Sequence, residues 1–197
     1  MANRQQSAEK VAMRQIAAAR AYRILESGPI LMVCTHDGVR PNIMTMGFHM
    51  MIQHAPPLIG CVIGPWDHSF AALNKTGQCV LAVPGADLAR TVVDVGNCSG
   101  VAVDKFECFG LATARPAKVN VPLLSDCLYN IECVIHDNTM VDKYQLFILK
   151  AVAIWSNDSR RERRYLHHHG DGTFTADGER FDLQDRMTQW KQFQVDL

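Results

Sequence analysis

The chain of 197 residues is 48% hydrophobic and 20% charged, which supplies enough apolar material for one folded core and argues against global disorder. Twenty basic and twenty acidic residues give a formal net charge of zero, so the chain has no basic excess with which to bind nucleic acid. The seven cysteines are odd in number and show no Cys-x-x-Cys spacing, so we expect reduced thiols in the cytoplasm rather than disulfides or a zinc site. No apolar run approaches the ~18 residues of a membrane helix and no secretion signal is recognised, so we expect no membrane insertion.

The first predicted element is a helix over residues 8–25, because apolar residues recur there every three or four positions and Gly28-Pro29 follows. Residues 30–35 and 40–46 are predicted as the two strands of a hairpin. The turn between them is Asp37-Gly38, a dipeptide that tolerates the positive φ of tight turns.

Four further strands are predicted where short apolar runs are bounded by Gly, Pro or polar turn residues: 58–63, 79–83, 129–135 and 146–155. Two Asp-Gly dipeptides near the carboxyl terminus, at 171–172 and 177–178, indicate a small additional hairpin.

Short helices are predicted between the strands. One begins at Ser69 as its N-cap and stops at Gly77, and a second runs from Asp87, as its cap, to Val95. Residues 101–109 fit either a short helix or a turn.

These strands do not alternate with long helices, as a doubly wound parallel sheet would require, and we therefore expect an all-β antiparallel barrel with short helical inserts and an N-terminal helix. The expected organisation is a helical extension over residues 1–27, a barrel domain over 28–158, and a carboxyl-terminal hairpin and tail over 159–197 packed on the same domain.

The first chemical candidate is the stretch 41–48. The amide of Asn42 and the hydroxyl of Thr45 could orient the edge of a planar ring, and Met44, Met46 and Phe48 could cover its faces. The alternative is an ordinary strand end with a satisfied asparagine.

Two further candidates suit an anion. Residues 64–69 combine a helix N-terminus with His68 and Ser69, although Ser69 could simply cap the helix. Residues 96–100 form a small-residue turn whose N–H groups could face a phosphate, with Lys105 as counter-charge.

Two other motifs suggest a catalytic or metal site, and each meets a structural objection. The pattern Gly96-x-Cys98-x-Gly100 also matches a nucleophile elbow and so admits a cysteine hydrolase, but that motif needs a preceding strand and a following helix that are not expected here. The triplet 167–169 is all histidine, yet neighbouring strand residues point to opposite faces, so no metal site is expected.

Taken in this order, the segments resemble the flavin reductase-like family of FMN-binding split barrels, particularly its flavoredoxin-like branch, over residues 28–155. The matching pieces are the strand 29–35 with its Asp-Gly turn, Asn42-x-Met44-Thr45-x-Gly47, Pro56-Pro57-Leu58, Gly64-Pro65 with His68-Ser69, and Ser99-Gly100 leading to Asp104-Lys105-Phe106.

The resemblance implies a Greek-key barrel, a homodimer with FMN near the subunit interface, and a redox role; FAD or riboflavin is less expected. Asn42, Met44 and Thr45 would then approach the isoalloxazine, with Phe48 beside the ring. The phosphate would lie among His68, Ser69, Ser99 and Lys105, and the cofactor set is completed by Gly47, Ile63, Gly64 and Cys98.

Two departures from the family pattern bear on function. Phe48 stands where many relatives have tryptophan, and residues 141–144 read Val-Asp-Lys-Tyr where relatives that use nicotinamide have Gly-Asp-His. The sequence therefore allows a flavin reductase with NAD(P)H as co-substrate, or a flavoredoxin-like carrier that takes electrons from a partner protein without oxidising NAD(P)H. No catalytic acid or base is assigned.

Overall fold

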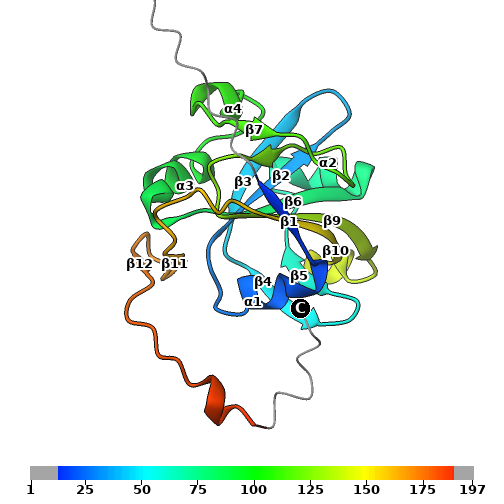
Figure 1. The fold of residues 1–197 in the computed structure, drawn as a ribbon. Coiled ribbons are helices and arrows are strands. Elements are labelled where there is room, and N and C mark those ends of the chain that lie inside the picture. The colour runs from blue at the N-terminus through cyan, green and yellow to red at the C-terminus, as the bar shows by residue number, and fades with distance from the viewer. Residues whose placement is uncertain (1–12, 189–197) are drawn as a thin grey trace, which may run out of the picture.

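A computed structural model describes residues 13–188, whose backbone forms one large antiparallel sheet with a few short helices (Figure 1). The eight strands of this sheet are β1 (Arg14–Ile16), β2 (Leu31–His36), β3 (Pro41–Met46), β4 (His49–Gln53), β5 (Leu58–Val62), β6 (Gln78–Val83), β9 (Tyr129–Asp137) and β10 (Leu146–Ser156). Two small ladders pair β7 (Thr113–Ala114) with β8 (Leu123–Leu124) and β11 (Leu166–His168) with β12 (Phe174–Ala176).

The order of strands shows why the sheet curls. It runs β3-β2-β6-β9-β10-β5-β4, so β3 and β4 lie at its two ends, while only Gly47 and Phe48 separate them along the chain. A link this short reaches about 10 Å at most. The two ends of the sheet must therefore lie next to each other, which confirms the predicted antiparallel barrel, here a split one.

Both faces of the central strands are buried. Leu31 and Val33 of β2 belong to the core inside the barrel, whereas Met32 and Cys34 pack on the outer side with Val92 of α3 (Ala89–Gly96). A strand covered on both sides has no polar face, which explains why the predicted strands read as unbroken apolar runs.

The remaining helices are α1 (Ala21–Leu25), α2 (His68–Thr76), α4 (Lys105–Cys108) and α5 (Val141–Tyr144), with 3-10 turns at η1 (Ala18–Arg20), η2 (Ala86–Leu88) and η3 (Gln184–Arg186). Helices α2, α3 and α4 contact β2 or β3, and α1 contacts β4 (Figure 1). Within residues 13–188, no helix is long and apolar enough to cross a membrane.

All six predicted strands are present, with ends that differ by one or two residues. The turn prediction also holds: Gly38 has φ +100°, and the Asp37 carboxylate accepts hydrogen bonds from the N–H groups of Val39 and Arg40. The carboxyl-terminal hairpin is formed by β11 and β12. Strand β4 was not predicted, because His49 and Gln53 leave an apolar run of only Met50 to Ile52, shorter than the runs that mark the other strands.

The predicted helix over residues 8–25 is wrong over much of its described part. Residues 1–12 lie outside the described residues, Arg14–Ile16 is strand β1, and the α-helix covers only Ala21–Leu25. Strand β5 pairs with β10 only as far as Lys150, which leaves that edge of β10 without a partner beyond this point. Strand β1 pairs with β10 there, opposite Ile154 to Ser156. This tertiary pairing outweighs the local helical preference.

Helix α1 belongs to the barrel rather than lying outside it. Its residues Ala21, Ile24 and Leu25 are buried in the inner core. The division of the chain at residue 27 stays a prediction, and these contacts show that the segment before residue 27 shares the core of the barrel.

The two predicted helix caps are wrong. Helix α2 is preceded by Asp67 as its N-cap, and Ser69 lies within its first turn with its hydroxyl turned to other partners; Gly77, at φ +69°, does end the helix. Asp87 lies in η2 and forms an ion pair with Arg160 instead of capping α3. In both cases the side chain has a tertiary partner that the local pattern could not reveal.

A buried carboxylate fastens the long connection before β9 to the outer face of the sheet. Glu132 of β9 is fully buried and accepts hydrogen bonds from the backbone N–H groups of Ala117, Lys118 and Val119, at 2.6–2.9 Å. It also accepts one from Trp155 Nε1 at 2.6 Å. Four donors thus satisfy one buried charge, which is the condition under which such a charge is tolerated.

We expect Glu132→Ala to lower the free energy of unfolding by about 3–5 kcal/mol, because it leaves buried N–H donors without an acceptor. Glu132→Gln keeps the shape and one acceptor oxygen, and should cost about 1–3 kcal/mol. Urea unfolding measures both values. No loss in Glu132→Gln, together with a large loss in Glu132→Ala, would show that the side chain acts by volume rather than by its charge and hydrogen bonds.

Candidate functional site

A cleft of about 390 Å³ lies along strand β3, between the start of α2 and the end of α3. It brings together seven of the predicted site residues: Asn42, Met44, Thr45, His68, Cys98, Ser99 and Lys105. Six others also line it. Trp66, Asp67, Gly96, Asn97 and Gly100 lie in the predicted stretches 64–69 and 96–100 but had no individual role, and Val95 was predicted only as the end of a helix. The cleft volume is in the range of small-molecule sites.

Lys105 carries the buried positive charge of the cleft. The residue is only 5% exposed, and its Nζ donates a hydrogen bond of 2.8 Å to the carbonyl oxygen of Val95. Burial lowers the pKa of the ammonium from its ordinary value, and Cys98 and Asp67 act in the opposite direction. An ammonium has three N–H donors, and Val95 is the one hydrogen-bond acceptor that residues 13–188 supply, so donors remain for a ligand.

Lys105 is the first residue of helix α4, and a side-chain cap at the start of this helix stabilises it. Asp104 is its N-cap, and the Asp104 carboxylate accepts hydrogen bonds from the N–H groups of Phe106 and Glu107 at 3.0 and 3.1 Å. The segment 101–109, which the sequence left open between helix and turn, is therefore a turn that ends in a short helix.

A buried chain of polar side chains orients Asn42. The Asn42 amide donates to Ser69 Oγ at 2.9 Å, and Thr35 Oγ1 lies 3.1 Å from the same oxygen. Ser69 and Thr35 are fully buried. Since the amide nitrogen is committed to Ser69, the Asn42 carbonyl oxygen is held in a fixed direction, towards Gly100.

Gly100 allows two walls of the cleft to approach each other. A Cβ atom at this position would lie 2.2 Å from Asn42 Oδ1 and 2.7 Å from His68 Cδ2. Behind it, Arg40 Nη2 donates to the Gly100 carbonyl oxygen at 2.8 Å. The turn 96–100 thus packs against β3 and α2 so closely that only glycine fits.

Two further residues differ from the predicted roles. Thr45 Oγ1 donates to the Val92 carbonyl oxygen at 2.6 Å, so this hydroxyl anchors α3 to β3 and offers a ligand only its lone pairs. Ser69 is not a cleft-lining residue, and its part is to position Asn42.

Trp66 forms an aromatic border that the sequence did not assign. Its side chain is 74% exposed, and its indole lies over Gly64, where a Cβ would come within 2.2 Å of the ring. Asp67 accepts a hydrogen bond from the Gly64 N–H at 3.0 Å and fixes the same turn. Trp66 lies in the predicted stretch 64–69, and its place directly after Gly64-Pro65 is the signal that could have given it a role.

Besides Ser69, four predicted residues lie outside the cleft lining. Gly47 and Phe48 form the link between β3 and β4, where Phe48 is 76% exposed. Ile63 is fully buried in the inner core and can act only as support. Gly64 is covered by Trp66 rather than open to the cleft.

The elbow geometry that a cysteine hydrolase needs is not found around Cys98. Helix α3 ends at Gly96, so a helix rather than a strand precedes this residue. Its Sγ lies 3.9 Å from the Val95 carbonyl oxygen. The thiol is a wall of the cleft without the strained strand-to-helix turn of that motif.

Two histidines of the triplet, His167 and His168, have hydrogen-bond partners within the protein. His167 contacts Asp177 Oδ1 and the Gly28 carbonyl oxygen, and His168 accepts a hydrogen bond from the Gly172 N–H. Among residues 13–188, no group of three or more His, Cys, Asp or Glu side chains is placed to hold a metal ion.

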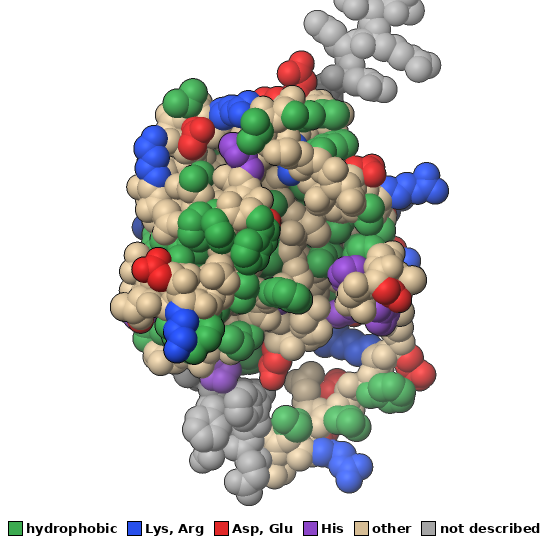
Figure 2. Space-filling view, turned by 180° about the vertical axis from the view of Figure 1, so that it is seen from behind, with side chains coloured by type: hydrophobic (Ala, Val, Ile, Leu, Met, Phe, Trp, Pro, Cys, Tyr) green, Lys and Arg blue, Asp and Glu red, His purple; other side chains and the backbone are tan. Residues whose placement is uncertain are grey.

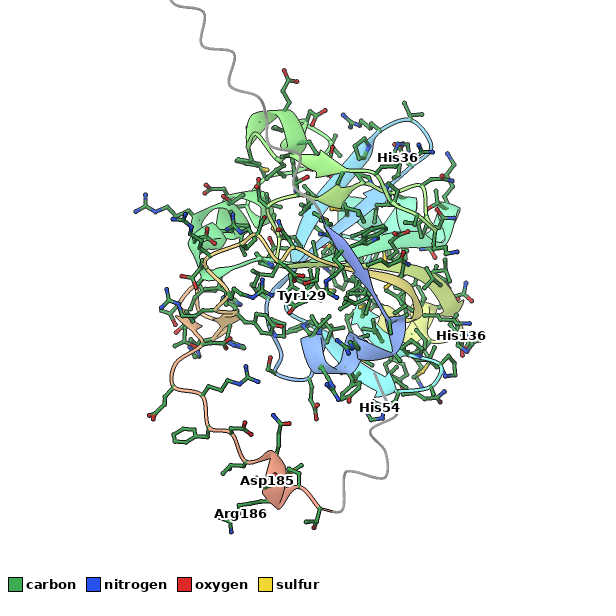
Figure 3. All side chains as sticks on the ribbon, in the orientation of Figure 1. His36, His54, Tyr129, His136, Asp185 and Arg186 are labelled. Atoms are coloured by element: carbon green, nitrogen blue, oxygen red, sulfur yellow. The ribbon has the colours of Figure 1, made fainter. Side chains whose placement is uncertain are left out.

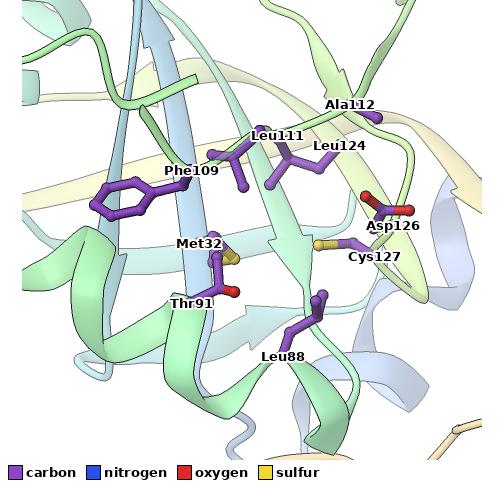
Figure 4. Close-up of a pocket in the computed structure, with 10 residues that line it drawn as sticks. Met32, Leu88, Thr91, Phe109, Leu111, Ala112, Leu124, Asp126 and Cys127 are labelled. Atoms are coloured by element: carbon purple, nitrogen blue, oxygen red, sulfur yellow. The ribbon is translucent and has the colours of Figure 1, made fainter. Parts of the chain in front are cut away.

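A second cavity lies between α3 and the segment after α4 (Figure 4). It has about 80 Å³ and is lined largely by apolar side chains, including Met32, Phe109, Leu111 and Leu124. This volume is well below that of a cofactor site, and the cavity bears none of the predicted residues.

Comparison with known proteins identifies the family. Residues 24–175 match the model of the flavin reductase like domain. The chain is 28% identical to the uncharacterized protein YddH of Escherichia coli over 174 residues, which cover 81% of this chain and 92% of that protein.

Solved structures share the fold. An FMN-binding domain of flavin reductases-like enzyme from Shewanella baltica has a TM-score of 0.80 at 22% identity, covering 87% of this chain and 97% of that one. The flavoredoxin of Desulfovibrio vulgaris has a TM-score of 0.71 at 20% identity, covering 79% and 89%. The matched domain spans most of the chain and supports a flavin-related redox function, and the chain belongs to the flavin reductase-like family.

Proposed function

We propose that this protein binds FMN in the cleft beside β3 and passes electrons through the bound flavin. The observation that carries the proposal is the nearly buried ammonium of Lys105, which faces a cleft rather than an acidic partner at hydrogen-bond distance. A buried cation with unused donors is stabilised by an anion, and a phosphate is the anion of this cofactor.

The phosphate end of FMN fits the part of the cleft around Lys105. The turn 96–100 presents backbone groups there, Ser99 is exposed, and His68 opens helix α2 on the opposite side. The positive end of the α2 dipole adds to the attraction.

The ring end fits the outer edge of β3. This strand pairs with β2 alone among the described strands, so its other edge has free backbone donors and acceptors for the edge of a flavin ring. Asn42, Met44 and Thr45 lie along it, and Trp66 supplies exposed aromatic surface in the cleft; the exposed Phe48 follows the end of β3, outside the cleft lining. The site thus has a charged end and an apolar, planar end, as FMN requires.

Bound FMN would supply the redox chemistry itself. The described side chains would bind the phosphate, orient the ring and exclude water from part of it. No side chain is assigned as an acid or base.

Two electron sources remain in the proposal: NAD(P)H, as for a flavin reductase, or a partner protein, as for a flavoredoxin-like carrier. The residues that replace the Gly-Asp-His pattern, 141–144, form α5 and do not line the cleft of their own chain. This favours the carrier. The homodimer implied by the family resemblance, and a cytoplasmic setting in keeping with seven free thiols, complete the proposal.

We expect FMN to bind more tightly than riboflavin, and Lys105→Met to remove most of the difference. The variant should weaken FMN by about 1.5–3 kcal/mol, because it deletes a charge-assisted contact but keeps the apolar stem. Fluorescence titration of both flavins measures this. Riboflavin is the internal control, since loss of the Val95 hydrogen bond affects both ligands; equal weakening of the two would remove Lys105 from the phosphate site.

We expect Gly100→Ala to lower FMN affinity at least about tenfold, because the added methyl group must displace Asn42 or His68. Gly178→Ala is the matched control, since nothing lies within 4 Å of a Cβ there. Isothermal titration of both variants tests the close approach of the two cleft walls, and unchanged affinity in Gly100→Ala would contradict it.

A carrier should purify yellow and oxidise NADH or NADPH at a negligible rate in the presence of free FMN. A reductase that treats flavin as a substrate should turn over when both are present. An absorbance spectrum followed by a steady-state assay separates the two roles, and a protein that neither retains nor binds FMN would contradict the proposed function.

A further inference from the structure

A groove of about 870 Å³, called the arginine groove here, is formed by residues of α1, the start of β9, the segment 161–165 and the residues that follow β12. It shares no lining residue with the cleft beside β3. Figure 3 shows Tyr129, one of its lining residues, on the side of the barrel next to the β11–β12 hairpin. The volume is in the range of small-molecule sites, and the proposed function gives this groove no role.

Arginines dominate the charge of the groove. Five line it, contributed by three separate segments: Arg23, Arg161, Arg163, Arg164 and Arg180. Figure 2 shows basic side chains where the hairpin meets the chain that follows it. Since the formal net charge of the whole chain is zero, the groove is a local accumulation of positive charge.

The three carboxylates of the groove do not balance these arginines. Glu162 is bound by Arg164, whose guanidinium lowers the pKa of the Glu162 carboxyl to about 2. Both carboxylate oxygens of Asp177 have hydrogen-bond partners within the hairpin. In the described part of the chain, the other four arginines form no ion pair, and Glu179 is the one carboxylate of the groove that is not engaged.

Arg163 is held in place by neutral groups. Its Nη1 donates to the Asn157 carbonyl oxygen at 3.0 Å, and its Nη2 donates to the Tyr129 hydroxyl at 3.1 Å. The guanidinium also lies over the Tyr129 ring, 5.7 Å from its centroid. A guanidinium has five N–H donors, so three remain, and a group already fixed in position loses less entropy when it binds an anion.

Two tyrosines give the groove an aromatic part. The half-buried rings of Tyr129 and Tyr165 meet edge to face, with their centroids 6.4 Å apart. Burial, and then the neighbouring Tyr129, raise the pKa of the Tyr165 hydroxyl, so this group stays protonated and can donate a hydrogen bond. The groove thus combines hydroxyl donors and aromatic surface with an excess of arginines.

We propose that the arginine groove binds an organic ligand with two or more phosphate groups. A phosphate suits these side chains because its oxygens accept the paired N–H donors of a guanidinium. A single phosphate would leave part of the four unpaired arginines without an anion, so more than one phosphate is expected. The remaining volume and the two tyrosines accommodate the organic part. The ligand is assigned no redox step, and it needs none of the residues proposed for FMN.

NMR of the full chain locates the site. Inorganic pyrophosphate is titrated into ¹⁵N-labelled protein, and the backbone amides of residues 161–165 and 177–180 are expected to shift. The same titration of Lys105→Met is the control, because the cleft is itself proposed as a phosphate site. Shifts at 161–165 that persist in Lys105→Met support the proposal, and shifts confined to residues 96–105 would overturn it. The result does not depend on whether the protein binds FMN.

Calorimetry measures the contribution of single arginines. Arg163→Gln should raise the dissociation constant of pyrophosphate at least about tenfold. Arg161→Gln should raise it at least about threefold; Arg161 is exposed and has no hydrogen bond in the described part of the chain, so this variant does not act through the fold. Arg115→Gln is the matched control, since Arg115 is exposed and lies outside the groove. Unchanged binding in Arg161→Gln and Arg163→Gln, or an equal loss in Arg115→Gln, would overturn the proposal.

Two further ligands test the chemical class. ADP should bind at least as tightly as pyrophosphate, because the groove has room for an organic part. Binding of pyrophosphate without binding of ADP would overturn the organic part of the proposal. A hexaglutamate peptide that binds more tightly than ADP would overturn it in favour of an acidic protein surface.

Discussion

The two-residue link between β3 and β4 is the constraint on which the rest of the structure depends. Because Gly47 and Phe48 must join the two ends of a seven-strand path, the sheet curls and its inner face becomes a closed core. The closure is incomplete, since β3 and β4 do not pair with each other. This gap leaves β3 with a free edge, and the candidate cofactor cleft lies along that edge.

Buried polar side chains then fix the connection before β9 and one wall of the cleft. Glu132 and Asn130, two residues apart on β9, hold the connection 113–124 through hydrogen bonds to its backbone, and Ser69 orients Asn42. Each of these contacts satisfies a backbone or amide group that would otherwise be buried without a partner. In the cleft itself, Lys105 keeps N–H donors beyond its hydrogen bond to Val95.

The sequence predicted the strands well because both of their faces are buried, which produces unbroken apolar runs. It also predicted Asn42 and Lys105 as binding residues, and the structure brings them to one cleft. The parts it missed depend on contacts between distant segments. Strand β1 exists because β10 offers an edge, Ser69 turns to Asn42 instead of capping its helix, and Gly100 is needed because Asn42 and His68 approach it. None of these leaves a local pattern.

The cysteines of this protein differ in reactivity because of where the barrel places them: five are buried, Cys98 is half-buried and Cys108 is exposed. Burial raises the pKa of the Cys34, Cys61 and Cys133 thiols well above the usual range, so they stay protonated and react slowly with oxidants and alkylating agents. Cys108, at the end of α4, is exposed. A thiol-directed probe should therefore attach first at the helix that carries Lys105, which would place a spectroscopic label beside the cleft without any engineered cysteine.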